Sequence, residues 1–256
     1  MVKISFITFT RNSAERIGAL LENIKDVVDE IIVIDGFSSD DTVKIAKSYG
    51  AKVFCRRPKG IVELDRMFAL RKCSNEWVLY LDDDERLGIK LKSDLRKLIE
   101  ETDACAISCM RINISPRGEV LSHFYPDLQI RIFRRSKTKF RGIVHEKPLI
   151  AGTIKTLPQS YYILHILNRY AHYLPMKKLV TYAYFESRQR YQEKIAKSPL
   201  HRALIFLSPF SILPLYLYYV FLLSKERFLN LSTLFAVFFD FALYRGFIEV
   251  LKKVRV

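Results

Sequence analysis

The chain has 256 residues, half of them hydrophobic, and a formal net charge of +15 at pH 7. This length accommodates one domain with an appendage and argues against two domains of equal size. The basic surplus favours an anionic partner, but no segment resembles a nucleic-acid-binding module. The four cysteines, at 55, 73, 105 and 109, lack zinc-type spacing, so we expect reduced thiols and a cytoplasmic compartment.

The first part of the chain alternates between strand-like and helix-like segments. Residues 4–9 predict a strand, and Asn12 with Glu15 three residues later predicts a capping box. The helix that follows carries one apolar face, made of Ile17, Leu20, Leu21 and Ile24. Residues 30–35 form a continuous β-branched run, which is typical of a strand covered on both faces.

The same alternation continues toward residue 80. Residues 38–42 supply cap residues and first-turn acids for a second helix that ends near Tyr49. Residues 51–55 predict a third strand, and a third helix is marked by Leu64, Met67 and Phe68. Strands that alternate with helices predict a parallel sheet with right-handed crossovers.

An acidic cluster, Asp82-Asp83-Asp84, directly follows the apolar run 77–81. In a parallel sheet this cluster and Asp35 fall at the same edge, where open α/β sheets bind ligands. Carboxylates at such an edge suit Mg²⁺ or Mn²⁺, which commonly bind one or two carboxylates together with a substrate diphosphate. A solvated acidic turn with Asp as a helix cap is the alternative.

Three segments in this order, 5–12, 32–42 and 79–85, resemble the successive signatures of family 2 glycosyltransferases. Residues 125–135 and 144–146 resemble the subgroup typified by lipopolysaccharide-core β-glucosyltransferases. The resemblance covers the first 150 residues well and the remainder loosely. It implies an α/β fold of the Rossmann-like GT-A type and an inverting transfer from a nucleoside-diphosphate sugar.

The resemblance also implies a divalent metal, Mg²⁺ or Mn²⁺, which neutralises the charge that grows on the leaving diphosphate. Asp82 and Asp84 match the outer acids of the family's Asp-x-Asp motif, and Asp82 is also expected to contact the nucleotide. On a strand-like backbone, Asp83 would point away from its two neighbours. His145 would complete the metal shell or donate a hydrogen bond to the diphosphate, with a purely structural role as the alternative.

The nucleoside is expected over the first two strand ends. Thr8, Arg11 and Asp35 match family positions that contact the base, the ribose or a nearby phosphate. Asp35 could instead be a turn residue, and Arg11 an ordinary surface charge. Arg66 is a further base or phosphate contact by resemblance, but Met67 replaces the family's Asn, and a solvated helix face is the alternative.

An inverting step needs a general base for the acceptor hydroxyl. Asp127 is the first candidate because it matches the acid before the subgroup's Gln-x-Arg stretch, and Glu146 is the second. A structural role remains open for both. Gln129, Arg131 and Arg134 are expected to face the diphosphate or the acceptor together.

The last third of the chain changes character. We expect a catalytic domain at 1–150 and a basic helical region at 151–256, which holds 15 Lys and Arg against 5 Asp and Glu. Residues 203–223 are uncharged, and 228–244 form a second apolar stretch. Bordered by cations, this apolar helical appendage predicts an interfacial anchor; a re-entrant hairpin, a true span or a buried helical layer are the alternatives.

No signal peptide is expected, because the first residues already form a strand, so the predicted location is the cytoplasmic face of the cell membrane. The predicted acceptor is a membrane-held, lipid-linked or glycan hydroxyl or phosphate. One rival function, a sugar-1-phosphate nucleotidyltransferase, is disfavoured because the chain lacks a Gly-rich opening loop with Arg and Lys. The intact acids at 35, 82, 84 and 127 disfavour the other, a non-catalytic membrane adaptor. The donor sugar and base depend on pocket contacts that spacing alone does not determine.

Overall fold

The structure is a computed structural model that describes residues 2–59, 61–121, 126–142 and 146–167. The chain divides into two compact units, Met1–Ala171 and His172–Val256, and every described residue belongs to the first. The apolar stretches at 203–244 and their predicted anchor lie outside the described residues. Among the residues that are described, no helix is long and apolar enough to cross a bilayer.

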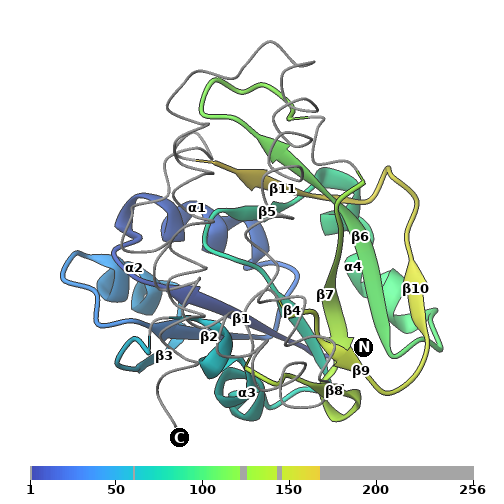
Figure 1. The fold of residues 1–256 in the computed structure, drawn as a ribbon, viewed down its shortest axis with the longest axis horizontal. Helices are drawn as coiled ribbons and strands as arrows, with labels where there is room; N and C mark the ends of the chain where they lie inside the picture. Colours follow the sequence, from blue (N-terminus) through green and yellow to red (C-terminus); the bar gives the residue numbers. More distant parts are fainter. Residues whose placement is uncertain (1, 60, 122–125, 143–145, 168–256) are drawn as a thin grey trace, which may run out of the picture. The chain divides into compact units, whose positions relative to one another are not determined.

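The first unit is built around a nine-stranded mixed sheet, drawn in Figure 1. The strand order is β3-β2-β1-β4-β7-β6-β11-β5, and β10 pairs with β6. The strands of this sheet are β1 (Ile4–Thr10), β2 (Glu30–Asp35), β3 (Lys52–Cys55), β4 (Trp77–Tyr80), β5 (Glu85–Leu87), β6 (Ala106–Ile114), β7 (Leu128–Arg134), β10 (Ile154–Thr156) and β11 (Tyr162–Ile166). The remaining elements are a two-stranded sheet of β8 (Thr138–Lys139) and β9 (Leu149–Ile150), a 3-10 turn (Arg135–Lys137), and the helices α1 (Ala14–Ile24), α2 (Thr42–Ser48), α3 (Glu63–Lys72) and α4 (Ile89–Glu100).

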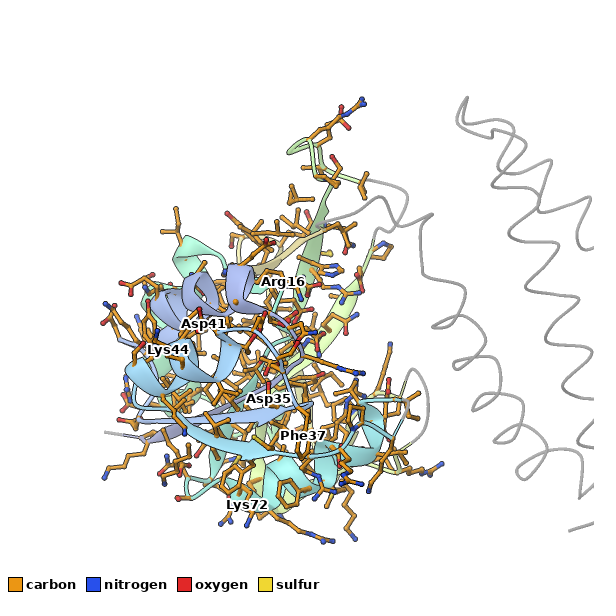
Figure 2. All side chains as sticks on the ribbon, turned by 90° about the vertical axis from the view of Figure 1, so that its left-hand side faces the viewer. Arg16, Asp35, Phe37, Asp41, Lys44 and Lys72 are labelled. Atoms are coloured by element: carbon orange, nitrogen blue, oxygen red, sulfur yellow. The ribbon has the colours of Figure 1, made fainter. Side chains whose placement is uncertain are left out.

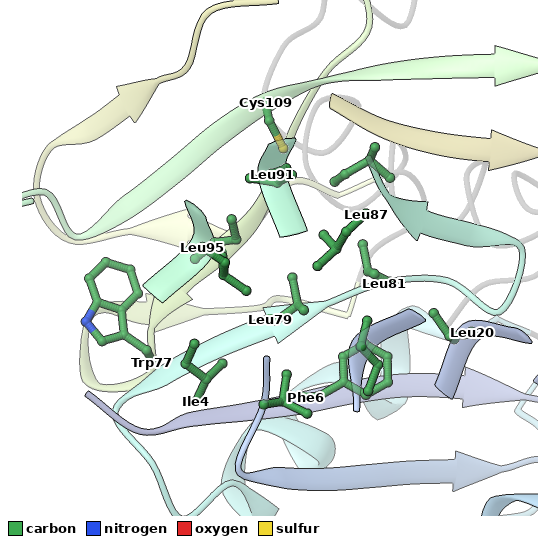
Figure 3. Packing of buried hydrophobic residues seen from close by; sticks show 14 of the residues in the cluster. Ile4, Phe6, Leu20, Trp77, Leu79, Leu81, Leu87, Leu91, Leu95 and Cys109 are labelled. Atoms are coloured by element: carbon green, nitrogen blue, oxygen red, sulfur yellow. The ribbon is translucent and has the colours of Figure 1, made fainter. Parts of the chain in front are cut away.

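The predicted strand and helix alternation is confirmed, because β1 pairs in parallel with both β2 and β4, and β2 with β3. Helices α1, α2 and α4 contribute buried residues to one core cluster, and α3 contributes to a second. Figure 3 shows part of the first cluster, where Phe6 and Leu79 of the sheet lie near Leu91 and Leu95 of α4. Because helices cover both faces of the sheet, the central strands are continuous apolar runs.

The loops after β1 and β2 hold each other through side-chain bonds. Asp40 accepts hydrogen bonds from the backbone N–H of Ala14 and of Thr42, both at 3.1 Å, at the starts of α1 and α2. Asn12 Oδ1 accepts the N–H of Ser39 at 2.8 Å. The predicted capping box of Asn12 and Glu15 is therefore wrong, because α1 begins after Ser13 and a carboxylate from the neighbouring loop supplies the acceptor.

The sheet gathers many strand ends at one edge, which we call the site edge. It consists of the carboxyl ends of β1, β2, β4, β6 and β11 and the amino ends of the antiparallel strands β5 and β7. Both β10 and β11 follow residue 150, and β11 pairs with β6. The compact unit therefore extends beyond the boundary expected at residue 150.

Candidate functional site

The acidic cluster follows β4 at the site edge, and its three side chains point in different directions. Asp84 is 30% exposed, and its Oδ2 lies 3.5 Å from Nε2 of His165 on β11. Asp83 turns toward α1, where it is hydrogen-bonded to Ser13 and lies 2.8 Å from the Arg16 guanidinium. The middle acid thus anchors the turn to α1 and has partners different from that of Asp84, although residues 83 and 84 form a turn and not the strand-like backbone that was expected.

Asp82 is held by the residues beneath it. Its Oδ2 lies 2.6 Å from Arg131 Nη2, and its Oδ1 accepts the Tyr80 hydroxyl at 2.7 Å. Burial acts to raise the pKa of Asp82, but the Arg131 cation and the Tyr80 hydroxyl lower it overall. Arg131 also lies 2.6 Å from fully buried Glu85 and over the Tyr80 ring. It therefore neutralises the acids from inside the protein.

Asp127, the predicted base, lies at the same edge directly before β7. Its Oδ2 accepts hydrogen bonds from Arg111 Nε at 2.7 Å and Asn113 Nδ2 at 3.1 Å, and its Oδ1 accepts one from Gln129 at 2.6 Å. Burial acts to raise the pKa of Asp127, but these donors, led by Gln129, lower it overall. The carboxyl group is thus ionised at neutral pH. About four lone-pair sites on a carboxylate leave room for a further donor.

Strand register brings in residues that the sequence analysis missed. His165 pairs with Asn113 of β6 on one side and with Glu85 of β5 on the other. Directly paired residues place their side chains on the same face of a sheet, and Arg111 joins them two residues from Asn113. The available signal was Arg111 and Asn113 at alternate positions of the otherwise apolar segment 106–114.

The two nucleotide-binding candidates on β1 and β2 are buried. Thr8 is 0% exposed, and its hydroxyl has no hydrogen-bond partner within the described residues. Asp35, also 0% exposed, accepts bonds from Ser38 N–H and from the hydroxyls of Ser38 and Thr10. In this structure Asp35 organises its own turn and Thr8 lies inside the strand, and their contacts with a nucleotide stay predictions.

Exposed groups nevertheless border this part of the edge. Arg11 is exposed, and its side chain lies so close to Gly36 that a Cβ there would approach it to 3.3 Å. Phe37 follows at a φ of +58° and is 57% exposed (Figure 2). A bulky residue in the left-handed region is strained, and such strain clusters at ligand-binding sites.

Arg66 and Glu146 form a second group beneath the edge. Arg66 is only 9% exposed, so the solvated-face alternative is wrong, and its guanidinium lies 3.5 Å from the Tyr80 hydroxyl and 3.0 Å from the Glu146 carbonyl. The Glu146 carboxylate is 3% exposed and accepts the N–H groups of Arg141 and Gly142. A carboxylate buried in its own loop is a poorer candidate for a base than Asp127.

Arg134 is not brought to this site. It pairs with Trp77 at the amino end of β4, the opposite edge of the sheet, and its guanidinium stacks over the Trp77 ring at 4.8 Å. The expectation that Gln129, Arg131 and Arg134 face one ligand is therefore wrong for Arg134, because residues 129 and 134 do not share one strand face. His145 lies outside the described residues.

Asp84 and His165 fit a divalent cation that is shared with a substrate. Within the described ranges, no group of three or more His, Cys, Asp or Glu side chains could enclose a metal on its own. A carboxylate such as that of Asp84 suits Mn²⁺ or Mg²⁺ when diphosphate oxygens and water supply the other positions, and the His165 imidazole would add one nitrogen ligand. Their separation of 3.5 Å is near the roughly 3 Å between adjacent ligands of an octahedral ion.

The comparisons with solved structures concern the fold. S. aureus TarS 1-349 in complex with UDP-GlcNAc superposes with a TM-score of 0.52 at 18% identity, over 98% of this chain and 92% of that one. Mannosyltransferase PcManGT from Pyrobaculum calidifontis, in complex with GDP-Man and Mn²⁺, gives 0.53 at 17% identity, over 96% and 83%. The mixed α/β fold with a curled central sheet is therefore the GT-A type, as the resemblance implied.

Sequence comparison covers a smaller part of the chain than the structural comparison does. The glycosyltransferase RT0209 of Rickettsia typhi is 29% identical over 203 residues, which are 76% of this chain and 69% of that protein. Four other Rickettsia glycosyltransferases are matched over only 31–51% of their own length. Residues 5–161 match the model of glycosyl transferase family 2, so the chain belongs to this family.

Proposed function

We propose that the chain is an inverting, metal-dependent glycosyltransferase that moves a sugar from a nucleoside-diphosphate sugar to a hydroxyl or phosphate of its acceptor. One observation carries this proposal. At a single sheet edge, the Asp84 carboxylate lies 3.5 Å from the His165 imidazole, and a second carboxylate, the ionised Asp127, is joined to His165 through Asn113. The structural neighbours that hold UDP-GlcNAc, or GDP-Man with Mn²⁺, support the same assignment of donor class.

One group of residues at the site edge would bind the donor. A divalent ion on Asp84 and His165 would neutralise the negative charge that grows on the leaving diphosphate. Asp82 is already neutralised by Arg131, so it is better suited to accept a hydrogen bond from the donor's ribose than to bind metal. Arg11 and Phe37 border the nucleoside end of the same edge.

Asp127 acts on the acceptor. It takes the proton of the attacking hydroxyl as that oxygen bonds to the anomeric carbon, from the face opposite the departing diphosphate. The lowered pKa keeps Asp127 ionised and ready to accept this proton at neutral pH. Gln129, Arg111 and Asn113 hold its orientation.

We place the acceptor at a membrane. The basic surplus and apolar stretches of residues 151–256 support a lipid-linked saccharide, a phospholipid or a polyprenyl phosphate, reached from the cytoplasmic face. The transferred sugar could be glucose, galactose, mannose, heptose or an amino sugar. The nucleotide that carries it could be uridine diphosphate or guanosine diphosphate.

The test begins with the full chain and a panel of UDP- and GDP-sugars with Mn²⁺. A donor that binds only the folded state raises the melting temperature, and membrane extract should then yield a labelled lipid product. Asp84→Asn should abolish both the Mn²⁺-dependent shift and the transfer, while the circular dichroism spectrum stays that of the wild type.

Asp103→Asn is the matched control, because this exposed acid precedes β6 at the edge opposite the site. It should leave the thermal shift and the transfer unchanged. A folded wild type without a Mn²⁺-assisted shift from any donor would contradict the proposal. Release of pyrophosphate from a nucleoside triphosphate and a sugar phosphate would instead identify a nucleotidyltransferase.

A further inference from the structure

Asn113 lies between the proposed base, Asp127, and the proposed metal ligand, His165. Its side chain lies between strands β6, β7 and β11 and is 3% exposed. Its Nδ2 lies 3.1 Å from Asp127 Oδ2, and its Oδ1 lies 2.6 Å from His165 Nδ1. One amide therefore contacts both the candidate base and the candidate metal ligand.

The chemistry of these neighbours determines which group donates at each of the two Asn113 contacts. An ionised carboxylate only accepts hydrogen bonds, so Asn113 must present its NH₂ group to Asp127. Its carbonyl oxygen then faces His165, and this oxygen also only accepts. The bond of 2.6 Å thus requires the hydrogen to be on Nδ1 of His165.

This proton position determines what His165 offers to the site. With Nδ1 protonated, the other nitrogen of a neutral imidazole carries a lone pair. That nitrogen, Nε2, is the one that lies 3.5 Å from Asp84. A metal-binding histidine commonly has its tautomer determined by the hydrogen bond at its second nitrogen.

We propose that Asn113 is a positioning residue that fixes the Nδ1-protonated tautomer of His165 for metal binding and simultaneously orients Asp127. The inference rests on the proposed function and adds a physical link between its donor and acceptor halves. The metal ligand and the base are held by one side chain, so a displacement of either is transmitted to the other.

Gln129 provides a matched comparison. Like Asn113, it donates one hydrogen bond to Asp127, at 2.6 Å, but no hydrogen bond or ion pair joins it to His165 within the described residues. Gln129→Leu and Asn113→Leu therefore each remove one donor from the base. Only the second removes the acceptor from His165.

The experiment measures Mn²⁺ binding to the full chain in the presence of UDP or GDP by electron paramagnetic resonance, beside transferase activity. Asn113→Leu should weaken Mn²⁺ binding by about 10- to 100-fold, and Gln129→Leu should leave it unchanged, although both lower the transfer rate. Asn113→Asp restores an acceptor for His165 but no donor for Asp127. It should therefore recover Mn²⁺ affinity without recovering activity.

A long-range ¹H–¹⁵N spectrum supplies the tautomer directly, with His165 assigned by its loss in His165→Gln. The wild type and Asn113→Asp should show the Nδ1-protonated form, and folded Asn113→Leu should lose this preference. The inference about Asn113 would be wrong, and the proposed function untouched, if folded Asn113→Leu kept the wild-type Mn²⁺ affinity. The same holds if the wild type showed a His165 ring protonated on Nε2. Failure of the wild type to bind any Mn²⁺ would overturn the proposed function with it.

Discussion

At the scale of single residues, Glu85 is the centre of the charge network beneath the site. Its Oε1 lies 2.6 Å from Arg131 and 3.1 Å from Arg111, and its Oε2 accepts the N–H of Asp82 at 3.0 Å. The two arginines in turn hold Asp82 and Asp127. A fully buried carboxylate thus connects Asp82 and Asp127 through two arginines.

We expect Glu85→Gln to destabilise the fold strongly. Removing one partner of a buried ion pair leaves the other charge uncompensated and costs about 3 to 5 kcal/mol, and here two arginines lose a counterion. Urea unfolding of the full chain measures the change. The control is Glu22→Gln, which breaks an exposed pair with Lys25 and should leave the unfolding curve in place. Equal midpoints for the two variants would contradict this account.

At the scale of elements, the edge opposite the site is held together by Glu30 at the start of β2. Its carboxylate bonds to Ser5 of β1, to Lys52 of β3 at 2.8 Å, and to Ser74 before β4. Burial acts to raise the pKa of Glu30, but Lys52 and the Ser5 and Ser74 donors lower it overall to about 2. One side chain therefore links four neighbouring strands.

This shift predicts a pH dependence of stability. A carboxyl group with a lowered folded-state pKa stabilises the fold above its unfolded pKa, and this contribution is lost as the pH falls from about 4.5 to about 2. The lowering of the Glu30 pKa corresponds to at most about 3 kcal/mol in the free energy of unfolding. The free energies of unfolding of wild type and Glu30→Gln, measured in urea, should differ at pH 7 and converge toward pH 2. A difference that is independent of pH would refute this explanation.

At the scale of the whole molecule, charge and hydropathy are distributed unevenly along the sequence. The formal net charge of +15 includes 15 Lys and Arg against 5 Asp and Glu in residues 151–256, beside the apolar stretches at 203–244. Cations that border apolar segments bind anionic headgroups. The family model ends at residue 161, so this region lies almost wholly beyond the part that defines the chemistry.

We therefore expect the full chain to float with vesicles that contain anionic lipid. Binding should weaken with added salt, since screening shortens the range of the attraction, and it should be weaker on purely zwitterionic vesicles. Replacing Lys252, Lys253 and Arg255 by Gln tests the cations at the end of the chain, and flotation should fall while donor binding stays the same. A wild type that remains at the bottom of the gradient at low salt contradicts the membrane proposal.

Local pattern was sufficient for β1 to β4, for the first three helices and for the acids at the strand ends, but it did not predict α4 or β11. Period and composition predicted β1, β2 and β4. Asp83 contacts Ser13 and Arg16, but residues 83 and 84 form a turn after β4, so its direction does not follow from strand alternation. Asp84 and Asp127 also came from the sequence, through family resemblance. The capping box failed because α1 begins after Ser13, and Asp40 from another loop accepts the N–H of Ala14 at the start of this helix.

The sequence by itself determined the family, the parallel core and the acids of the site edge, because these depend on periodicity and on motifs that are contiguous in the chain. Only the tertiary structure placed His165 and Asn113 beside those acids, buried Asp35 and Arg66, and moved Arg134 to the opposite edge. The physical reason is that antiparallel and non-consecutive strand pairing sets which distant residues meet, and no local pattern records that register.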